Sequence, residues 1–262
     1  MKKTNSMYAV VTGAGQGLGK AYVSELAKRG INIILVSLPG ENLPELSKET
    51  AHRHSVETAY YECDLAIGKN VLELADWINK NFEVFLLINN AGTGGTRQFL
   101  DASAEYINTI IQLNVAATSL LTRQLLPNLI KQPQSYILNV SSMAAFSPIG
   151  YKTVYPATKS FVHSFSRGLN AELRGTNVFV SVVNPGAMKT SPEITARIER
   201  QGVFGKLTLL DPQKAAKKCI DSLFRRDSVI MLNPVSWFIL SLIPIWIKLP
   251  LMTNTIKREL CA

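Results

Sequence analysis

A tyrosine and a lysine in the middle of the chain have a spacing suited to acid–base chemistry. Tyr155 and Lys159 are four residues apart, so on a helix their side chains lie on one face. A tyrosine with an ordinary pKa of about 10 is a poor base near neutrality, but a neighbouring ammonium group favours the phenolate and lowers that pKa. Ser142 precedes Tyr155 by thirteen residues, and a hydroxyl can stabilise charge that develops on a substrate oxygen. Side chains of these types are suited to proton transfer in catalysis.

A glycine-rich turn near the N-terminus is suited to hold a dinucleotide. Residues 12–19 read Thr-Gly-Ala-Gly-Gln-Gly-Leu-Gly, and they follow a short apolar run and precede a helical pattern. Glycine permits positive φ and a close approach of pyrophosphate to the backbone, and a helix N-terminus supplies free N–H groups. The spacing differs from the G-x-G-x-x-G fingerprint. The position between a first strand and a helix is therefore what predicts dinucleotide binding.

The second apolar run, residues 31–37, is expected to end near the adenosine ribose. An acidic residue there would bind the 2′-hydroxyl and repel a 2′-phosphate. The chain instead continues as Ser37-Leu38-Pro39-Gly40, with no carboxylate before Glu41 and no arginine directly after the strand. The missing carboxylate favours NADP(H) over NAD(H), whereas the missing arginine keeps NAD(H) as the alternative.

The elements that position these residues alternate between strands and helices. Helical patterns cover residues 20–29, 71–81, 104–130 and 161–174. Runs rich in Val, Ile, Leu and aromatic residues, typical of buried strands, cover residues 8–11, 31–37, 58–63, 85–89, 136–140 and 178–183. The alternation predicts βαβ units and a parallel sheet, and continuous apolar strands predict helices on both faces. We expect one α/β, doubly wound Rossmann-type domain over residues 1–232 and a C-terminal tail over 233–262.

Three further motifs occur at strand ends in a fixed order. Asn89-Asn90-Ala91-Gly92 follows the fourth predicted strand, Ser141-Ser142 the fifth, and Asn184-Pro185-Gly186 the sixth. Together with the glycine turn and Tyr155-x-x-x-Lys159, this ordered set resembles the short-chain dehydrogenase/reductase family. The resemblance runs from about residue 8 to residue 190, roughly 70% of the chain.

The resemblance implies roles for four catalytic residues. Tyr155 would donate a proton to the carbonyl oxygen as hydride arrives from the nicotinamide, and Ser142, selected over Ser141 by its spacing, would hydrogen-bond that oxygen. Lys159 would lower the pKa of Tyr155 and hold the nicotinamide ribose. Asn114, in the long helical pattern, would orient a water for proton relay.

The same resemblance, with the strand-end argument for Ser37, implies the cofactor contacts. They are expected from Gly13, Gln16, Gly17, Leu18, Gly19, Ser37, Asp64, Leu65, Asn90, Ala91, Gly92, Tyr155, Lys159, Pro185, Gly186, Met188 and Thr190. Two departures from the family pattern stand out. Leu38 occupies a position that is often arginine, and Pro156 follows Tyr155. Because proline suits the first turn of a helix, we expect the active helix to begin near Pro156.

The substrate expectation comes from the segment after the Pro-Gly motif, which shapes the pocket in this family. Residues 189–210 alternate apolar and basic side chains, which favours a lipophilic ketone or its alcohol with a fatty acyl, sterol-like or isoprenoid group. Carrier-bound 3-oxoacyl thioesters and small polar ketones or sugars are alternatives. A non-catalytic dinucleotide-binding sensor or scaffold is an alternative of another class, but it would not need all four catalytic residues.

Charge and composition limit the partners. The net charge is +9, and residues 197–262, with 11 basic and 5 acidic residues, contribute +6 of it. The sequence contains no basic stripe interleaved with aromatic residues, so nucleic acid is not an expected partner. Residues 233–251 hold two of the three tryptophans among many Ile and Leu, which predicts contact with a membrane surface, a pocket lid or a subunit contact. Pro244 is expected to divide this tail into two helices.

The remaining composition points to a cytoplasmic protein, with the tail as a possible peripheral anchor at the inner face of a membrane. Three scattered cysteines and three histidines predict neither a disulfide framework nor a metal site. Residues 7–11 are read as a first strand rather than as part of a signal peptide, and no apolar stretch is long enough to span a bilayer. The family resemblance implies a homodimer or homotetramer.

Overall fold

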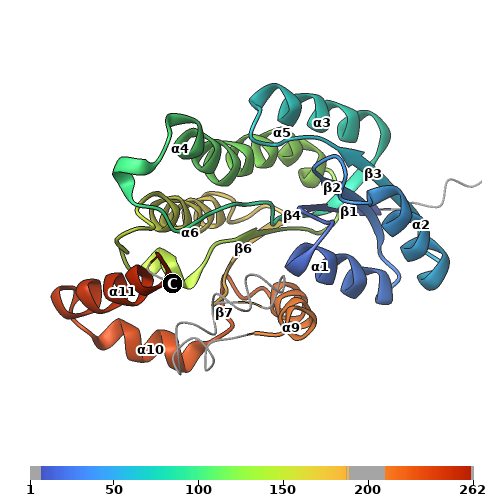
Figure 1. Cartoon of the computed structure of the whole chain (residues 1–262). Coiled ribbons are helices and arrows are strands. Elements are labelled where there is room, and N and C mark those ends of the chain that lie inside the picture. Colours follow the sequence, from blue (N-terminus) through green and yellow to red (C-terminus); the bar gives the residue numbers. More distant parts are fainter. Residues whose placement is uncertain (1–6, 187, 189–209, 261–262) are drawn as a thin grey trace, which may run out of the picture.

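A parallel β-sheet runs through the centre of the protein in the computed structural model, which describes residues 7–186, 188 and 210–260. The sheet has seven strands in the order β3-β2-β1-β4-β5-β6-β7 (Figure 1). The strands are β1 (Met7–Thr12), β2 (Asn32–Ser37), β3 (Thr58–Glu62), β4 (Glu83–Asn89), β5 (Ser135–Val140), β6 (Val178–Asn184) and β7 (Val229–Met231). Their order reverses between β1 and β4, which is the switch point of a doubly wound sheet. The predicted Rossmann-type α/β fold is confirmed.

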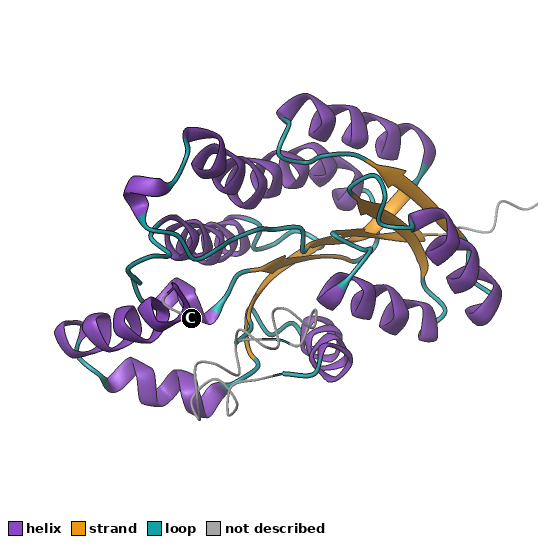
Figure 2. Cartoon of the chain, viewed as in Figure 1, coloured by secondary structure: helices purple, strands orange, loops and turns teal. Residues whose placement is uncertain are grey.

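The continuous apolar strands are explained by helices on both faces of the sheet (Figure 2). Val10 and Val11 of β1 are both fully buried, yet they belong to separate hydrophobic clusters because successive strand residues point to opposite faces. Val11 packs in the cluster of α1 (Gly17–Lys28), α2 (Leu43–His54) and α9 (Pro212–Phe224). Val10 packs in the cluster of α3 (Gly68–Asn81) and α5 (Thr118–Ile130).

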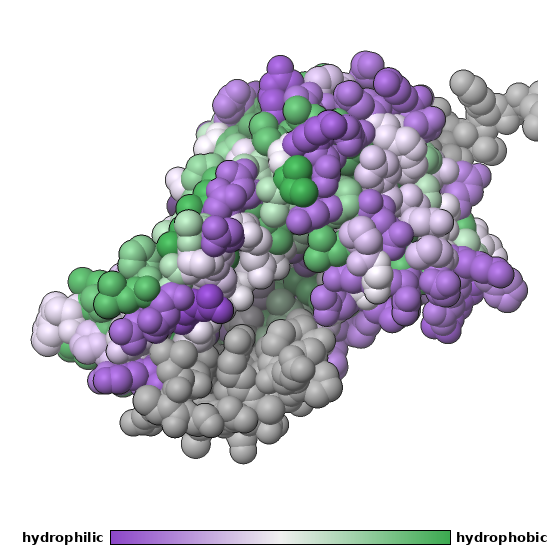
Figure 3. All heavy atoms as spheres, turned by 45° about the horizontal axis from the view of Figure 1, so that its top comes forward, coloured by the Kyte–Doolittle hydropathy of each residue, from purple (hydrophilic) through white to green (hydrophobic). Residues whose placement is uncertain are grey.

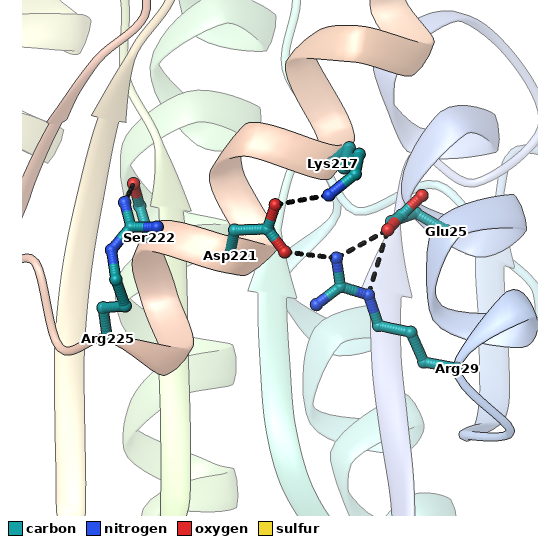
Figure 4. Close-up of polar contacts among 6 residues, drawn as sticks. All are labelled: Glu25, Arg29, Lys217, Asp221, Ser222 and Arg225. Atoms are coloured by element: carbon teal, nitrogen blue, oxygen red, sulfur yellow. Dashed lines mark hydrogen bonds and ion pairs between the residues drawn. The ribbon is translucent and has the colours of Figure 1, made fainter.

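Ion pairs join α1 to α9, two helices that are far apart in the sequence (Figure 4). The Nη2 atom of Arg29 lies 2.6 Å from Oε1 of Glu25 and 2.6 Å from Oδ1 of Asp221. Lys217 reaches the other carboxylate oxygen of Asp221 at 2.7 Å. The Arg29 guanidinium also lies 5.8 Å from the centre of the Phe224 ring. This cluster attaches the C-terminal part of the sheet to the first βα unit.

The helical pattern over residues 104–130 is divided in the structure. It forms α4 (Ala104–Ile111), a π-helical segment η2 (Gln112–Ala117) and α5. The active helix α6 (Val154–Glu172) begins earlier than the pattern over 161–174 indicates, at the point where Pro156 predicts a first turn. The sequence patterns did not identify α2, α9 or β7. Two single-turn 3-10 segments, η1 (Phe99–Asp101) and η3 (Met143–Phe146), complete this region.

Two helices follow β7 and lie beside η3 at one end of the molecule (Figure 1). They are α10 (Pro234–Leu242) and α11 (Ile245–Leu260), and Pro244 separates them as predicted. The backbone N–H of Gly150 donates to Oγ1 of Thr253 at 3.0 Å, and Nζ of Lys248 donates to the carbonyl oxygen of Phe146 at 3.3 Å. These contacts attach α11 to the main body. The domain boundary at residue 232 stays a prediction. Among the described residues, no helix is long and apolar enough to cross a membrane.

Candidate active site

Three predicted catalytic side chains meet at the carboxyl ends of β5 and its neighbours. Tyr155 and Lys159 lie in the first turns of α6, and the Lys159 ammonium is 5.8 Å from the centre of the Tyr155 ring. Ser142 follows the last residue of β5 by two positions, and its hydroxyl lies close enough to the Tyr155 side chain to lower the pKa of the phenol. This arrangement places two hydroxyl groups side by side, where both can reach one substrate oxygen.

The Tyr155 phenol is held in its neutral form in this environment. Burial raises its pKa above the ordinary value, and the hydrogen bond with Ser142 acts in the opposite direction. The loop after β4 covers the ring, because a Cβ atom on Gly94 would overlap the Tyr155 ring atoms. A neutral phenol at neutral pH is the form that donates a proton to a carbonyl oxygen.

Lys159 is buried, and burial lowers the pKa of its ammonium group to about 8. Its Nζ atom donates one hydrogen bond to the carbonyl oxygen of Val140 at 2.9 Å, and a lysine ammonium has three donors. A Cβ atom on Gly92 would come within 3.1 Å of this nitrogen. The absence of a side chain at Gly92 therefore lets the ammonium lie close to the backbone of the loop after β4.

Ser141 and Ser142 have different partners. The Ser141 hydroxyl is buried and donates to the carbonyl oxygen of Lys159 at 2.7 Å, which joins β5 to α6. The Ser142 hydroxyl accepts from the backbone N–H of Ala144 at 3.1 Å and faces Tyr155. This geometry agrees with the choice of Ser142 as the residue that contacts substrate, and it gives Ser141 a positioning role that the sequence did not indicate.

Asn114 lies in the π-helical segment η2, where the helical hydrogen bonds are displaced from their usual pattern. Its amide Nδ2 donates to the carbonyl oxygen of Thr93 at 2.8 Å and to Oγ1 of Thr158 at 3.0 Å. Its Oδ1 accepts from the backbone N–H of Thr93 at 2.9 Å. The side chain therefore holds the loop after β4 against α6. A role in proton relay stays a prediction.

The glycine-rich turn has the geometry that a pyrophosphate site requires. Gly13 (φ +63°) and Gly17 (φ +54°) are in the left-handed region, and a Cβ atom on Gly19 would overlap the carbonyl oxygen of Gly13. Helix α1 begins at Gly17 directly after Gln16, so its free N–H groups are at the turn. These residues fit a dinucleotide.

The Asn-Asn-Ala-Gly motif supports this turn from β4. Nδ2 of Asn90 donates to the carbonyl oxygens of Thr12 and Gly13 at 2.8 and 3.2 Å. The backbone N–H of Ala91 donates to Oγ1 of Thr12 at 2.9 Å. The Asn90 amide is thus engaged in holding the turn, so its contact with cofactor stays a prediction along with that of Ala91.

The predicted adenine side of the site includes a residue that the sequence reasoning missed. Glu41 accepts a hydrogen bond from the hydroxyl of Ser37, the buried last residue of β2. Asp64 accepts from the backbone N–H of Ala66 at 2.8 Å, and Leu65 after it is buried. A signal for Glu41 was available in the Pro-Gly sequence before it, because such a pair indicates a turn that can return the chain.

The nicotinamide side of the predicted site is described in part. The carbonyl oxygen of Pro185 accepts from the backbone N–H of Met143 at 2.8 Å, so the segment with Gly186 lies beside Ser142. Met188 pairs with Leu210 through an isolated parallel bridge. Thr190 and residues 189–209 of the predicted substrate segment lie outside the described residues.

Known proteins resemble this chain over most of its length. The model of the short chain dehydrogenase family matches residues 7–201. Very-long-chain 3-oxoacyl-CoA reductase from Macaca fascicularis is 31% identical over 254 residues, which cover 95% of this chain and 80% of that protein. Inactive hydroxysteroid dehydrogenase-like protein 1 from Homo sapiens is 33% identical over 191 residues, which cover 72% of this chain and 58% of that protein.

A solved structure agrees with these sequence matches. The structure of a short-chain dehydrogenase from Sphingobium yanoikuyae in complex with NADPH is 26% identical, has a TM-score of 0.77, and aligns with 91% of this chain and 96% of that one.

The chain spans 58–62% of the length of several curated relatives that it matches. The predicted resemblance to the short-chain dehydrogenase/reductase family is confirmed. The chain belongs to the short-chain dehydrogenase family.

Proposed function

We propose that the protein interconverts a ketone or aldehyde and an alcohol with NAD(P)(H) as the redox cofactor. The observation that carries this proposal is the pair of neighbouring hydroxyls of Ser142 and Tyr155, with the Lys159 ammonium beside the tyrosine ring. The neighbouring glycine turn fits the cofactor. We infer that Tyr155, Ser142, Lys159 and Asn114 form the catalytic set.

The mechanism assigns one task to each side chain. The nicotinamide, when bound, supplies or accepts the hydride. In reduction, Tyr155 donates its phenolic proton to the substrate oxygen, while Ser142 donates a hydrogen bond that stabilises charge on this oxygen. The Lys159 ammonium stabilises the phenolate that remains, because an opposite charge nearby favours the ionised form. In oxidation, the phenolate of Tyr155 accepts the proton of the alcohol.

A cavity beside the catalytic serine supports a lipophilic substrate. It has a volume of about 240 Å³ and lies between η3 and the two C-terminal helices. Its walls include Met143, Phe146, Trp237 and Met252, with Lys248 as a basic group. Met143 is adjacent to Ser142 in the chain, so an acyl chain in this cavity would place its carbonyl near the two hydroxyls. The name of the Macaca fascicularis relative specifies a very-long-chain 3-oxoacyl-CoA, and we favour a 3-oxoacyl thioester or another fatty acyl ketone.

A substrate panel tests this proposal. We expect NAD(P)H oxidation with 3-oxoacyl thioesters, and kcat/KM should rise with chain length because each buried methylene contributes about 0.8 kcal/mol. Small polar ketones and sugars serve as the comparison. Equal kcat/KM values for short, long and polar substrates would remove the argument for a lipophilic pocket.

The alternative of a non-catalytic sensor or scaffold has one supporting observation. The name of the human relative includes the word inactive, although that word is said of that protein. The complete set of Asn114, Ser142, Tyr155 and Lys159 favours an enzyme. Tight cofactor binding without turnover of any carbonyl or alcohol in the panel would instead support the sensor.

We also propose that α10 and α11 contact a membrane surface. Trp246 is 73% exposed, Leu242 67% and Phe238 58%, and Figure 3 shows apolar surface at the end of the molecule where Figure 1 places α11. No acidic residue occurs between Asp227 and Glu259, whereas three basic residues do. Exposed aromatic and aliphatic side chains beside positive charge are typical of interfacial helices, and an anionic lipid surface complements them.

Sedimentation with anionic phospholipid vesicles tests the membrane contact. We expect the full chain to sediment with vesicles at low salt and the variant Trp246→Glu to remain in the supernatant. Leu100→Glu is a matched control, because Leu100 is 88% exposed on η1, outside this surface. If the wild-type protein remains in the supernatant, the membrane proposal fails and the tail forms a pocket lid or a subunit contact; sedimentation velocity would then test the predicted homodimer or homotetramer.

The choice between NADP(H) and NAD(H) stays open to experiment. The sequence favours NADP(H) because no carboxylate lies at the end of the second strand before Glu41. The NADPH in the Sphingobium yanoikuyae structure is a property of that protein. The position of Glu41 bears directly on this choice.

A further inference from the structure

A carboxylate lies at the end of β2, although it belongs to a residue four positions further along the chain. Gly40 (φ +86°) and Asn42 (φ +53°) are in the left-handed region and turn the chain back at this point. The Ser37 hydroxyl donates to Oε2 of Glu41, and Nε2 of Gln16 donates to Oε1 at 3.2 Å. The turn therefore returns a negative charge to a strand end that is neutral in the linear sequence.

Glu41 also lies against the glycine-rich turn. A Cβ atom on Gly15 would overlap the side chain of Glu41, so the glycine leaves the space that the glutamate occupies. Gln16, the second partner of the carboxylate, is the residue directly before α1. The carboxylate thus lies between the end of the second strand and the first turn of the dinucleotide motif. In folds of this type the adenosine ribose binds between these two elements.

The charge of Glu41 is not neutralised by an ion pair within the part of the chain that the structure describes. The segment that joins it to β2 is Leu38-Pro39-Gly40, which has no cation. A negative charge without a neighbouring cation attracts hydroxyl donors and repels phosphate.

We propose that Glu41 is the specificity-determining residue for the adenosine ribose and that it makes NAD(H) the preferred cofactor. Its carboxylate would accept a hydrogen bond from the 2′-hydroxyl in exchange for those from Ser37 and Gln16. A 2′-phosphate at the same place would bring like charges together. The proposal rests on the dinucleotide site of the proposed function and is opposite to the preference that the linear sequence favours.

Calorimetric titration with two nicotinamide-free ligands tests this role. ADP-ribose and 2′-phospho-ADP-ribose differ only in the phosphate, and neither requires a substrate or turnover. We expect the wild-type chain to bind ADP-ribose at least about tenfold more tightly, because repulsion between like charges near a protein surface is of this order. In Glu41→Gln, which keeps the shape of the side chain without its charge, the ratio should fall by about tenfold, mainly through tighter binding of the phosphorylated ligand.

Glu45→Gln is the matched control. Glu45 is exposed in the first turn of α2, so this variant makes the same change in net charge four residues away. It should leave the ratio of the two affinities as in the wild type. Thermal unfolding establishes that each variant is folded.

Three results would overturn the proposal. If the wild type binds the phosphorylated ligand as tightly as ADP-ribose, or if Glu41→Gln and wild type give the same ratio, Glu41 does not select the cofactor, although the proposed enzyme function stands. If folded wild-type protein binds neither ligand nor NAD(P)H, the dinucleotide site fails and the proposed function fails with it.

Discussion

The hydroxyl of Ser141 donates to the backbone carbonyl oxygen of Lys159 at 2.7 Å, and this contact joins the end of β5 to the helix that carries the catalytic tyrosine. Ser142 is the next residue in the chain, so the same contact determines where its hydroxyl lies relative to Tyr155. The carbonyl oxygen of Val140, the residue before Ser141, accepts from the Lys159 ammonium at 2.9 Å. Val140 therefore accepts from the side chain of Lys159, and Ser141 donates to its backbone. Ser142, the next residue, faces Tyr155.

Replacing Ser141 tests this positioning role. Ser141→Ala leaves every proposed catalytic group in place but removes a buried hydrogen bond, which is expected to lower the free energy of unfolding by about 1 kcal/mol. We expect kcat to fall while the KM for cofactor changes little, because the Ser141 hydroxyl is buried and bonded to the Lys159 backbone. Ser141→Thr, which keeps the hydroxyl, should recover part of kcat. A wild-type kcat in Ser141→Ala would show that α6 is positioned without this bond.

Replacing Tyr155 tests the proton donor. Tyr155→Phe keeps the ring but removes the hydroxyl, and we expect turnover to fall on the order of 10²–10⁴-fold, as for other acid–base groups. Cofactor affinity, followed by fluorescence or calorimetry, should remain within a few-fold of the wild type. Tyr60→Phe on the exposed side of β3 is the control. Near-wild-type turnover in Tyr155→Phe would assign the proton transfer to another group.

Carbonyl reduction and alcohol oxidation should depend on pH in opposite ways. Reduction requires the neutral phenol, and burial raises the pKa of Tyr155, so kcat/KM for reduction should be constant near neutral pH. It should fall above about pH 8, because burial lowers the pKa of Lys159 to about 8 and the ammonium charge is lost there. Oxidation requires the phenolate and should become faster as pH rises toward this range. A reduction rate that increases through pH 8 would contradict these assignments.

The ion pairs between α1 and α9 should make the free energy of unfolding depend on pH in the acidic range. Hydrogen bonds from Lys217 and Arg29 lower the pKa of Asp221 below its ordinary value. A carboxyl with a lowered pKa in the folded state stabilises that state above its unfolded pKa of about 3.9, and the contribution is lost as pH falls through the folded pKa. Because Asp221 is partly exposed, Asp221→Asn should cost no more than about 1 kcal/mol at pH 7.

Urea unfolding at several pH values measures this contribution. The difference between wild type and Asp221→Asn should disappear near pH 2. The control is Asp76→Asn, on an exposed position of α3, which should match the wild type at each pH. A difference of the same size at pH 2 and pH 7 would mean that packing around Asp221, rather than its charge, is responsible.

Removing the Asn114 amide tests whether its hydrogen bonds hold the loop after β4 against α6. In Asn114→Ala, the buried contacts to both backbone groups of Thr93 and to the Thr158 hydroxyl are lost, and an unsatisfied buried polar group costs about 1–3 kcal/mol. We expect a lower melting temperature together with reduced kcat, because the loop also covers Tyr155. Unchanged stability would indicate that water replaces the amide.

Much of this protein follows from local sequence. The alternation of apolar runs and helical patterns determines a parallel sheet with helices on both faces, because strands buried on both sides must be apolar throughout. The glycine turn and the i, i+4 spacing of Tyr155 and Lys159 act within one turn or one helix face. The carboxyl ends of parallel strands meet at one edge of the sheet, so the order of the motifs is enough to predict that they lie together.

The tertiary structure alone decided which partner each of these side chains has. Ser141 contacts Lys159, Asn90 contacts the glycine turn, and Asn114 contacts Thr93, each through hydrogen bonds between residues distant in sequence. Glu41 shows the reason most clearly. In the sequence, Glu41 lies four residues beyond the end of β2. A turn with two left-handed residues brings its carboxylate back to the hydroxyl of Ser37. Sequence patterns record which side chains are present near a strand end, whereas backbone turns and packing determine which of them occupy the site.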